Sequence, residues 1–446
     1  MVVLKSLLLV GLLASVAQCV EMQVQKYLKP TANNGDFTPF KTFLDQVRSA
    51  KYEDYRSSAV RDEVAFKEMK DHILGMYGGV VSNVTSFVLE GKYGDCIAIK
   101  EQPTVYQLGI KEIAQPPTNS VNSRKTDRPA PGNSSHADSP LKLGLRDPFH
   151  NPISCPKGTI PMSRLTLERL TRFRTLNDFF SKPLFSMGNP APTAETHLHA
   201  RAEQKVSNFG GNSWMSLWNP SGAFSISQQW YAVGYQDGNK VLQTVEGGWR
   251  MDPHDEPAQS KSTLFIFWTA DGYGTLKCWN LDCAAFTQVN DGWYLDGPWD
   301  HYSTMDGEQW GFEMQWKLYQ GNWWLFLKGS GDYEAVGYYS GSIFDGGLLA
   351  KGATLITCGG EVATYASDER FPEMGSGAWA EKGWGEAAFH NTIFYIARDE
   401  TDGVGVWTNM APVDESVCYS IDIVDWTSGG EWGTYFYFGG PGNKGC

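Results

Sequence analysis

The second half of the chain consists of short runs of β-branched and aromatic residues separated by turns, and no long helical pattern interrupts them. Asp-Gly pairs, which favour tight hairpin turns, begin at positions that include 237, 271, 291, 306, 345 and 402. The best predicted strands are Ser213–Trp218, Phe224–Val233, Leu264–Trp268, Gly311–Leu318, Trp323–Leu327, Ala353–Ile356, Thr392–Ile396 and Tyr435–Phe438. Because no fixed-period repeat indicates a propeller, residues 191–446 are predicted to form an antiparallel, jelly-roll-like β-sandwich.

The first 190 residues differ from this part in charge and composition. They contain 24 Lys and Arg against 18 Asp and Glu, a net charge of +6, whereas residues 191–446 contain 13 against 32, a net charge of −19. All 17 Trp also follow residue 190. The net charge of the whole chain is −13, the wrong sign for general binding to nucleic acids or anionic membranes. We therefore expect two unlike domains, with neither nucleic acid nor membrane as a partner.

The N-terminus has the pattern of a secretory signal. Lys5 precedes an apolar run from Leu7 to Val16, with small residues at its end, so residues 1–19 are predicted to be a signal peptide. This run is too short to span a membrane, and no later apolar stretch reaches 18 residues. We expect a secreted, extracellular protein.

Residues 20–190 are predicted to form a small α+β domain. Apolar spacing indicates helix from Thr38 to Met76, and Val80 to Gln107 is strand-like, with β-branched residues broken by glycines. The segment from 115 to 154 is rich in Pro, Ser, Asn and Arg, a composition typical of a disordered linker. Asn83 and Asn133 begin glycosylation sequons.

Seven cysteines remain once the signal peptide is removed, and an oxidising compartment favours disulfides with one thiol left over. Short spacing allows a clipped hairpin and a tied-down C-terminus, with a third pair in the first half. The expected pairs are Cys278–Cys283, Cys418–Cys446 and Cys96–Cys155. Cys358 is the leftover thiol, and the lack of any CxxC pair argues against a zinc site.

Most catalytic motifs are absent. Ser376 lies in Met374-Gly-Ser-Gly377, which lacks the first glycine of a nucleophile elbow. His197-Leu-His199 has metal-capable spacing but no evident third ligand, and nucleotide-binding signatures are missing. We expect neither a metal nor another cofactor.

Two glutamates lie in apolar, glycine-lined strand contexts, Glu246 before Gly247-Gly248-Trp249 and Glu361 after Gly359-Gly360. Burial beside Val and Trp should raise the pKa of each carboxyl unless it is paired. Two such carboxyls facing each other would share one proton in acid, whereas a buried glutamate satisfied by hydrogen bonds is the commoner structural outcome.

These segments resemble the neprosin family of secreted glutamic endopeptidases. The matching stretches are Val245-Glu-Gly-Gly-Trp249, Phe267-Trp-Thr-Ala-Asp-Gly-Tyr273, Gly321-Asn-Trp-Trp324, Gly359-Gly-Glu-Val362, Met374-Gly-Ser-Gly377 and Phe438-Gly-Gly-Pro-Gly442. In the first half, Gly94-Asp-Cys96 and Cys155-Pro-Lys-Gly-Thr-Ile-Pro161 are similar to the family's activation peptide. The similarity covers nearly all of the chain after residue 38.

The resemblance implies an activation peptide over residues 20–190 and a catalytic domain over residues 191–446, with Glu246 and Glu361 as the catalytic pair. It also implies cleavage after proline at acidic pH, and disulfides that agree with the pairs in the second half. One departure is Cys358, at a position where the family resemblance leads us to expect an aromatic residue.

Two carboxyls without a nucleophile or metal can hydrolyse a peptide bond through water, one as base and the other as acid. The sequence leaves open which glutamate is the base. Gln228 or Gln229 could stabilise the oxyanion, and Trp249, Tyr273 and Trp324 could form an aromatic wall for a proline ring. Core packing is the alternative role for each of these side chains.

Two other classes remain open. Paired carboxylates with Trp platforms also hydrolyse glycosides, and a non-catalytic binding protein could retain the same fold. As a peptidase, the chain would be a monomeric zymogen with its own activation segment as inhibitor. Its junction contains three prolines after which it could cut itself, Pro183, Pro190 and Pro192.

Overall fold

The structure is a computed structural model that describes residues 37–118, 134–182, 197–234, 241–255, 259–364, 370–397, 404–407, 411–414, 417–424, 432–443 and 446. Its α-helices are α2 (Phe40–Ser49), α3 (Glu63–Met76), α4 (Pro103–Gln107), α5 (Leu167–Leu170) and α6 (Leu176–Phe180). The strands are β1 (Thr85–Leu89), β2 (Lys92–Ala98), β3 (Ser134–His136), β4 (Thr159–Ser163), β5 (His197–Ser216), β6 (Phe224–Val233), β7 (Gln243–Met251), β8 (Thr263–Thr269), β9 (Lys277–Trp279), β10 (Phe286–Gln288), β11 (Gln309–Tyr319), β12 (Asn322–Lys328), β13 (Glu334–Ser340), β14 (Ala353–Ala363), β15 (Ala388–Ala397), β16 (Val404–Val406), β17 (Ala411–Asp414), β18 (Ser420–Val424) and β19 (Thr434–Gly439). In the described part of the chain, no helix is both long and apolar enough to cross a lipid bilayer.

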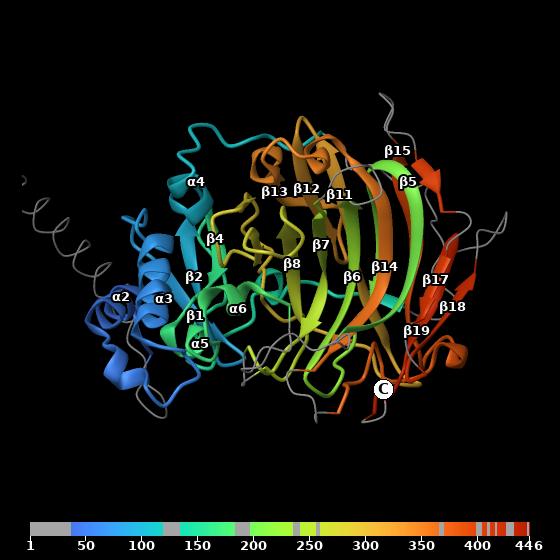
Figure 1. Ribbon diagram of the computed structural model, residues 1–446, viewed down its shortest axis with the longest axis horizontal. Helices are drawn as coiled ribbons and strands as arrows, with labels where there is room; N and C mark the ends of the chain where they lie inside the picture. Colours follow the sequence, from blue (N-terminus) through green and yellow to red (C-terminus); the bar gives the residue numbers. More distant parts are fainter. Residues whose placement is uncertain are drawn as a thin grey trace, which may run out of the picture.

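The N-terminal part forms a small α+β unit around a three-stranded antiparallel sheet in the order β1-β2-β4 (Figure 1). The helical pattern expected over residues 38–76 is present as α2 and α3, with a 3₁₀ turn at Tyr52–Tyr55 between them. Phe40, Phe43, Leu44 and Val47, whose spacing indicated the first helix, form its buried face.

Two segments of this unit differ from the expectation. Residues 103–107 are helical rather than extended, because Pro103 occupies the first turn of α4, where a backbone N–H has no helical partner in any case. The linker expected over residues 115–154 is partly ordered, because β3 pairs in parallel with β11 of the large sheet. The signal peptide, Asn133 and the junction prolines lie outside the described residues.

The second half forms one large, curled and almost wholly antiparallel sheet of 16 strands, to which β3 also belongs. The long strand β5 joins two layers, because its first half pairs with β14 and its second half with β11. Near this change of partner Gly210 has a φ of 119°, and an added Cβ would lie 2.0 Å from the carbonyl oxygen of Trp316. Only glycine permits this close crossing. The expected all-β architecture is therefore confirmed.

The two layers pack through aromatic side chains. The ring centroids of Tyr231 on β6 and Trp323 on β12 are 5.9 Å apart, and those of Trp268 and Tyr339 are 6.4 Å apart. Every residue of β6, β7 and β8 is buried. Both faces of this layer are therefore covered, one by the second layer.

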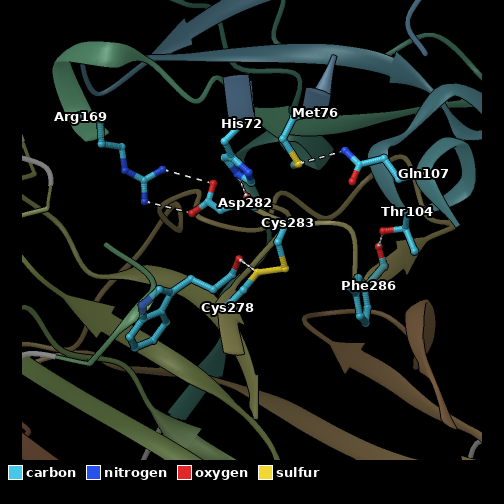
Figure 2. The surroundings of a disulfide bond; sticks show 10 residues. His72, Met76, Thr104, Gln107, Arg169, Cys278, Asp282, Cys283 and Phe286 are labelled. Carbon is cyan, nitrogen blue, oxygen red and sulfur yellow. Dashed lines mark hydrogen bonds and ion pairs between the residues drawn. A yellow bond between two sulfur atoms is a disulfide. The ribbon is translucent and has the colours of Figure 1, made fainter. Parts of the chain in front are cut away.

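The N-terminal unit docks on the loop closed by the Cys278–Cys283 disulfide (Figure 2). Arg169 forms an ion pair with Asp282 in this loop at 3.3 Å, and the hydroxyl of Thr104 donates a hydrogen bond to the carbonyl oxygen of Phe286. His72 of α3 also contacts the carbonyl oxygen of Asp282 at 2.8 Å. These contacts fix the unit against both ends of the strand order of the large sheet, β9 and β10.

Candidate active site

Glu246 and Glu361 converge because their strands flank the same neighbour. Strands β7 and β14 pair with opposite edges of β6, where Glu246 lies opposite Trp230 and Glu361 lies opposite Ile226. Side chains alternate along a strand, so these glutamates and Gln228 share the face that points away from the second layer. The two carboxylates are almost fully buried, with 0% and 3% exposure.

Glu361 is surrounded by nitrogen donors. The amide nitrogen of Gln228 donates to its Oε2 at 2.6 Å, and His197 Nδ1 lies 2.6 Å from its Oε1. His199 Nε2 is 3.8 Å from Oε2. Burial by itself would raise the pKa of Glu361, but Lys182 and the two imidazoles outweigh it and hold that pKa well below its usual range.

Glu246 is surrounded mainly by hydroxyl groups. Thr244 Oγ1 and Tyr273 Oη donate to its Oε1 at 2.7 and 2.8 Å. Tyr273 reaches it because the turn that begins at Asp271 reverses the chain, and Tyr273 itself has a left-handed φ of 63°. Burial and the neighbouring Glu246 raise the pKa of Tyr273 well above its usual value, so its hydroxyl remains a donor.

The ammonium group of Lys182 lies between the two carboxylates. Its Nζ is 2.9 Å from Glu246 Oε2 and 2.7 Å from Glu361 Oε2. Lys182 follows α6 in the N-terminal unit and is only 9% exposed. Burial would lower its pKa, but the two carboxylates more than offset this and raise it. The lysine is therefore charged and is shared by both glutamates.

A cavity of about 360 Å³ opens beside this ion cluster. It is lined by Ser181, Lys182, His197, His199, Arg201, Trp230, Leu242, Tyr273, Lys277 and Glu361. Lys182 also lies over the Trp230 and Phe267 rings, with Nζ 5.5 and 5.8 Å from their centroids. The cavity therefore combines an aromatic wall with the carboxylate of Glu361.

The structure brings only some of the predicted substrate-binding residues to this cavity. Gln228 contacts Glu361, and Tyr273 lines the cavity. Gln229 points into the core between the layers, where it donates to Ser213 and to the Met314 carbonyl. It is one residue out of phase with Gln228, so the strand's alternation places it on the other face.

The two predicted tryptophans are core residues, which corrects their assignment to the substrate wall. Trp249 is fully buried and donates its indole N–H to the Ser216 carbonyl, because it has the opposite parity to Glu246 on β7. Trp324 lies in the second layer against Tyr338. Trp230 takes the place expected of them, since it shares its parity with Gln228.

Lys182, His197 and His199 are further residues that sequence reasoning did not assign to the site. The alternation of His197-Leu-His199 placed both imidazoles on one strand face, but only the pairing of β5 with β14 brings that face to Glu361. Lys182 carries no local signal. Among the described residues, no group of three or more His, Cys, Asp or Glu side chains is arranged to hold a metal ion.

The three expected disulfides are present, and Cys358 is a free, buried thiol. Burial raises the pKa of Cys358 far above its usual value. Its side chain faces the interior between the layers, three residues from Glu361 and on the opposite side of β14. The departure at this position therefore does not alter the cavity wall.

Residues 221–441 match the family model described as Neprosin. Two crystal structures of scytalido-glutamic peptidase with transition-state analogues align with 54% of this chain and 97% of theirs, at 10% and 11% identity and TM-scores of 0.29 and 0.30.

The β-rich half of the molecule thus contains a Neprosin domain over residues 221–441. This domain match supports a peptidase function.

Proposed function

We propose that the chain is the precursor of a secreted glutamic endopeptidase in which Glu246 and Glu361 activate a water molecule. The observation that carries this proposal is the convergence of the two carboxylates on one nitrogen, at 2.9 and 2.7 Å. A water in the place of that nitrogen would be within hydrogen-bond reach of both carboxyls, as a general base requires.

The surroundings of the two glutamates support different roles for them. Once Lys182 has left, the hydrogen bond from Gln228 and the contact with His197 favour the ionised form of Glu361, so Glu361 takes the proton from the attacking water. Glu246 keeps an oxygen that faces this water once Lys182 has left, and the shared proton of the pair belongs there. Protonated Glu246 polarises the scissile carbonyl and then protonates the leaving amine. The second N–H of Gln228 is available to the oxyanion.

The position of Lys182 supports the proposal that the chain is an inactive zymogen. Its ammonium occupies the place of the catalytic water and neutralises part of the charge that the mechanism needs. It is supplied by the segment that the resemblance identifies as the activation peptide, residues 20–190. The activation segment therefore inhibits the enzyme from within the same chain.

Specificity for proline fits the aromatic wall of the cavity. Trp230 and Tyr273 line the space next to Glu361, and aromatic faces give a rigid ring a large apolar contact. A proline before the cleaved bond would lie against these rings, with its carbonyl near the carboxyl pair.

Secretion is supported by three disulfides, which persist in oxidising compartments, and by the signal-like N-terminus. Asn83 is exposed just before β1, so an oligosaccharide attached there would extend into solvent.

The proposal is tested by incubating acid-activated protein with a peptide library and, separately, with β-glucans. We expect internal cleavage after proline, faster at about pH 3 than at pH 7, when products are read by mass spectrometry. Cleavage of glucan alone would favour the glycosidase alternative. If fully processed protein cleaves neither peptides nor glucans, a binding protein is favoured.

A further inference from the structure

His197 has a distinctive position at the start of β5. Its Nδ1 lies 2.6 Å from Glu361 Oε1, on the side of the carboxylate away from the Lys182 contact. The backbone of His197 pairs with Ala363 of β14, and its ring meets Phe224 edge-on at 6.5 Å. The imidazole is therefore positioned by the β-sheet itself and not by the N-terminal unit.

Lys182 and His197 are the two described residues that border segment 183–196, and both contact Glu361. A cut within this segment has opposite consequences for them. Lys182 loses its covalent link to the β-rich domain, whereas His197 keeps its place through β-sheet pairing. Maturation would therefore free Lys182 from Glu361 and leave the His197 contact in place.

We propose that His197 is a positioning residue that orients Glu361 and, as an imidazolium, keeps it ionised in acid after Lys182 has left. This inference rests on the proposed function. The imidazolium would allow the Glu361 carboxylate to act as a base at a pH where carboxyls ordinarily take up protons. His199 supports the same charge from a greater distance, 3.8 Å.

The other charged groups near Glu361 are consistent with this role. Glu246 on β7 repels a second negative charge, and this would force a proton onto one of the two carboxyls. Arg201 on β5 and Lys277 at the start of β9 line the same cavity and add positive potential. His197 is the close imidazole partner that bonds Glu361 Oε1 and leaves Oε2 to Gln228 and the water.

The test is the pH profile of kcat/KM for activated His197→Gln. Glutamine can still donate a hydrogen bond but carries no charge. We expect the acid side of the profile, its acid limb, to move up by about one pH unit, so that kcat/KM falls roughly tenfold at pH values below it. KM, and kcat/KM at the optimum pH, should change little. His197→Lys should restore much of the limb, and His199→Gln should shift it less.

His301→Gln is the matched control, because His301 is half-exposed, pairs with Asp300 and stacks on Trp310 away from the site. It should leave the profile unchanged. If His197→Gln lowers activity equally at every pH, or shifts the limb no more than His301→Gln, the inference is wrong. Should His197→Gln fold poorly, His197→Lys tests the inference, and an acid limb that moves further up in His197→Lys than in His199→Gln would contradict it. If the activated wild-type protein has no peptidase activity, the proposed function is rejected instead.

Discussion

At the scale of single residues, Cys358 shows how strand parity separates a bystander from a participant. Its buried thiol lies on the face of β14 opposite to Glu361, and burial raises its pKa. We expect thiol-directed reagents and chelators to leave activated enzyme fully active. Mass spectrometry should find Cys358 unmodified in native protein and alkylated after denaturation. Inactivation by the thiol reagent would contradict this placement, and inactivation by a chelator would implicate His197 and His199.

Trp230 is the residue most directly placed to select proline. Replacing it with leucine removes an aromatic face beside Glu361 while keeping an apolar side chain. We expect Trp230→Leu to lower the preference for proline over alanine about three- to tenfold, measured as the ratio of kcat/KM values on paired peptides. Trp324→Leu, in the other layer, should lower the melting temperature and leave the ratio unchanged. An unchanged ratio in Trp230→Leu would remove this tryptophan from the specificity wall.

The sequence was sufficient to find both glutamates but not to sort their neighbours. Gln228 and Gln229 are chemically identical, and only the register of β6 against β7 and β14 decides which one meets Glu361. The alternation of side chains along the strands likewise places Trp249 in the core and Trp230 at the cavity. Register depends on pairing between distant segments, which a single sequence does not record.

At the scale of elements, the short helix α6 delivers Lys182 to the site. Thr175 and Asp178 form a capping box at its start, so the helix and the chain leaving it are well defined. The helical spacing of α2 and α3 was readable because each buries one continuous face. The contact of Lys182 was not, because it joins segments of two different units.

Removal of the Lys182 charge should weaken latency. In Lys182→Met the two buried carboxylates lose their common counterion, and the activation segment loses its anchor at the centre of the site. We expect this precursor to process itself several-fold faster than wild type in mild acid, followed on gels over time. Lys41→Met, on the exposed face of α2, is the matched control. Equal rates for both variants would show that Lys182 does not restrain the enzyme.

At the scale of the whole molecule, the unlike charges of the two halves meet in a buried network. Arg169 pairs with Asp255 at 2.6 Å, and Lys92 pairs with Asp296 at 3.2 Å. Burial alone would raise the pKa values of both aspartates, but these cations hold them below the usual range. Burial dominates at Asp282 and raises its pKa to about 6.

The sign of these shifts predicts the pH of activation. Asp255 and Asp296 stabilise docking above their free pKa of about 4, and this contribution falls as they are protonated below it. Asp282 has the opposite effect. Because its pKa is raised in the docked form, its protonation in mild acid stabilises docking. We therefore expect little self-processing at pH 5–6 and rapid processing at about pH 3. Arg169→Gln should move the onset to higher pH.

N-terminal sequencing after incubation across this pH range is the measurement. The expected fragments begin near Leu184, Ala191 or Thr193, after the prolines of the junction. A precursor that stays intact at about pH 3 would contradict self-activation. So would a pure Glu361→Gln precursor that is processed as fast as wild type.

The division into two unlike halves was visible in the sequence, as was the opposite sign of their net charges. The particular pairs were not, because Arg169 and the aspartates lie in segments that meet only after both units fold. The same holds for β3, which a linker composition concealed although it joins the large sheet.

The central claim is that Glu246 and Glu361 act together on one water. The most direct test is kcat/KM for Glu246→Gln and Glu361→Gln, with the activation segment removed from both by an external protease. Glutamine keeps the shape of glutamate but cannot ionise. The kcat/KM of each variant should therefore fall by several orders of magnitude, while its melting temperature stays near that of wild type. Glu313→Gln, a buried glutamate paired with Lys328 in the other layer, should remain active. Retention of more than about a tenth of wild-type activity in either catalytic variant would contradict the two-glutamate mechanism.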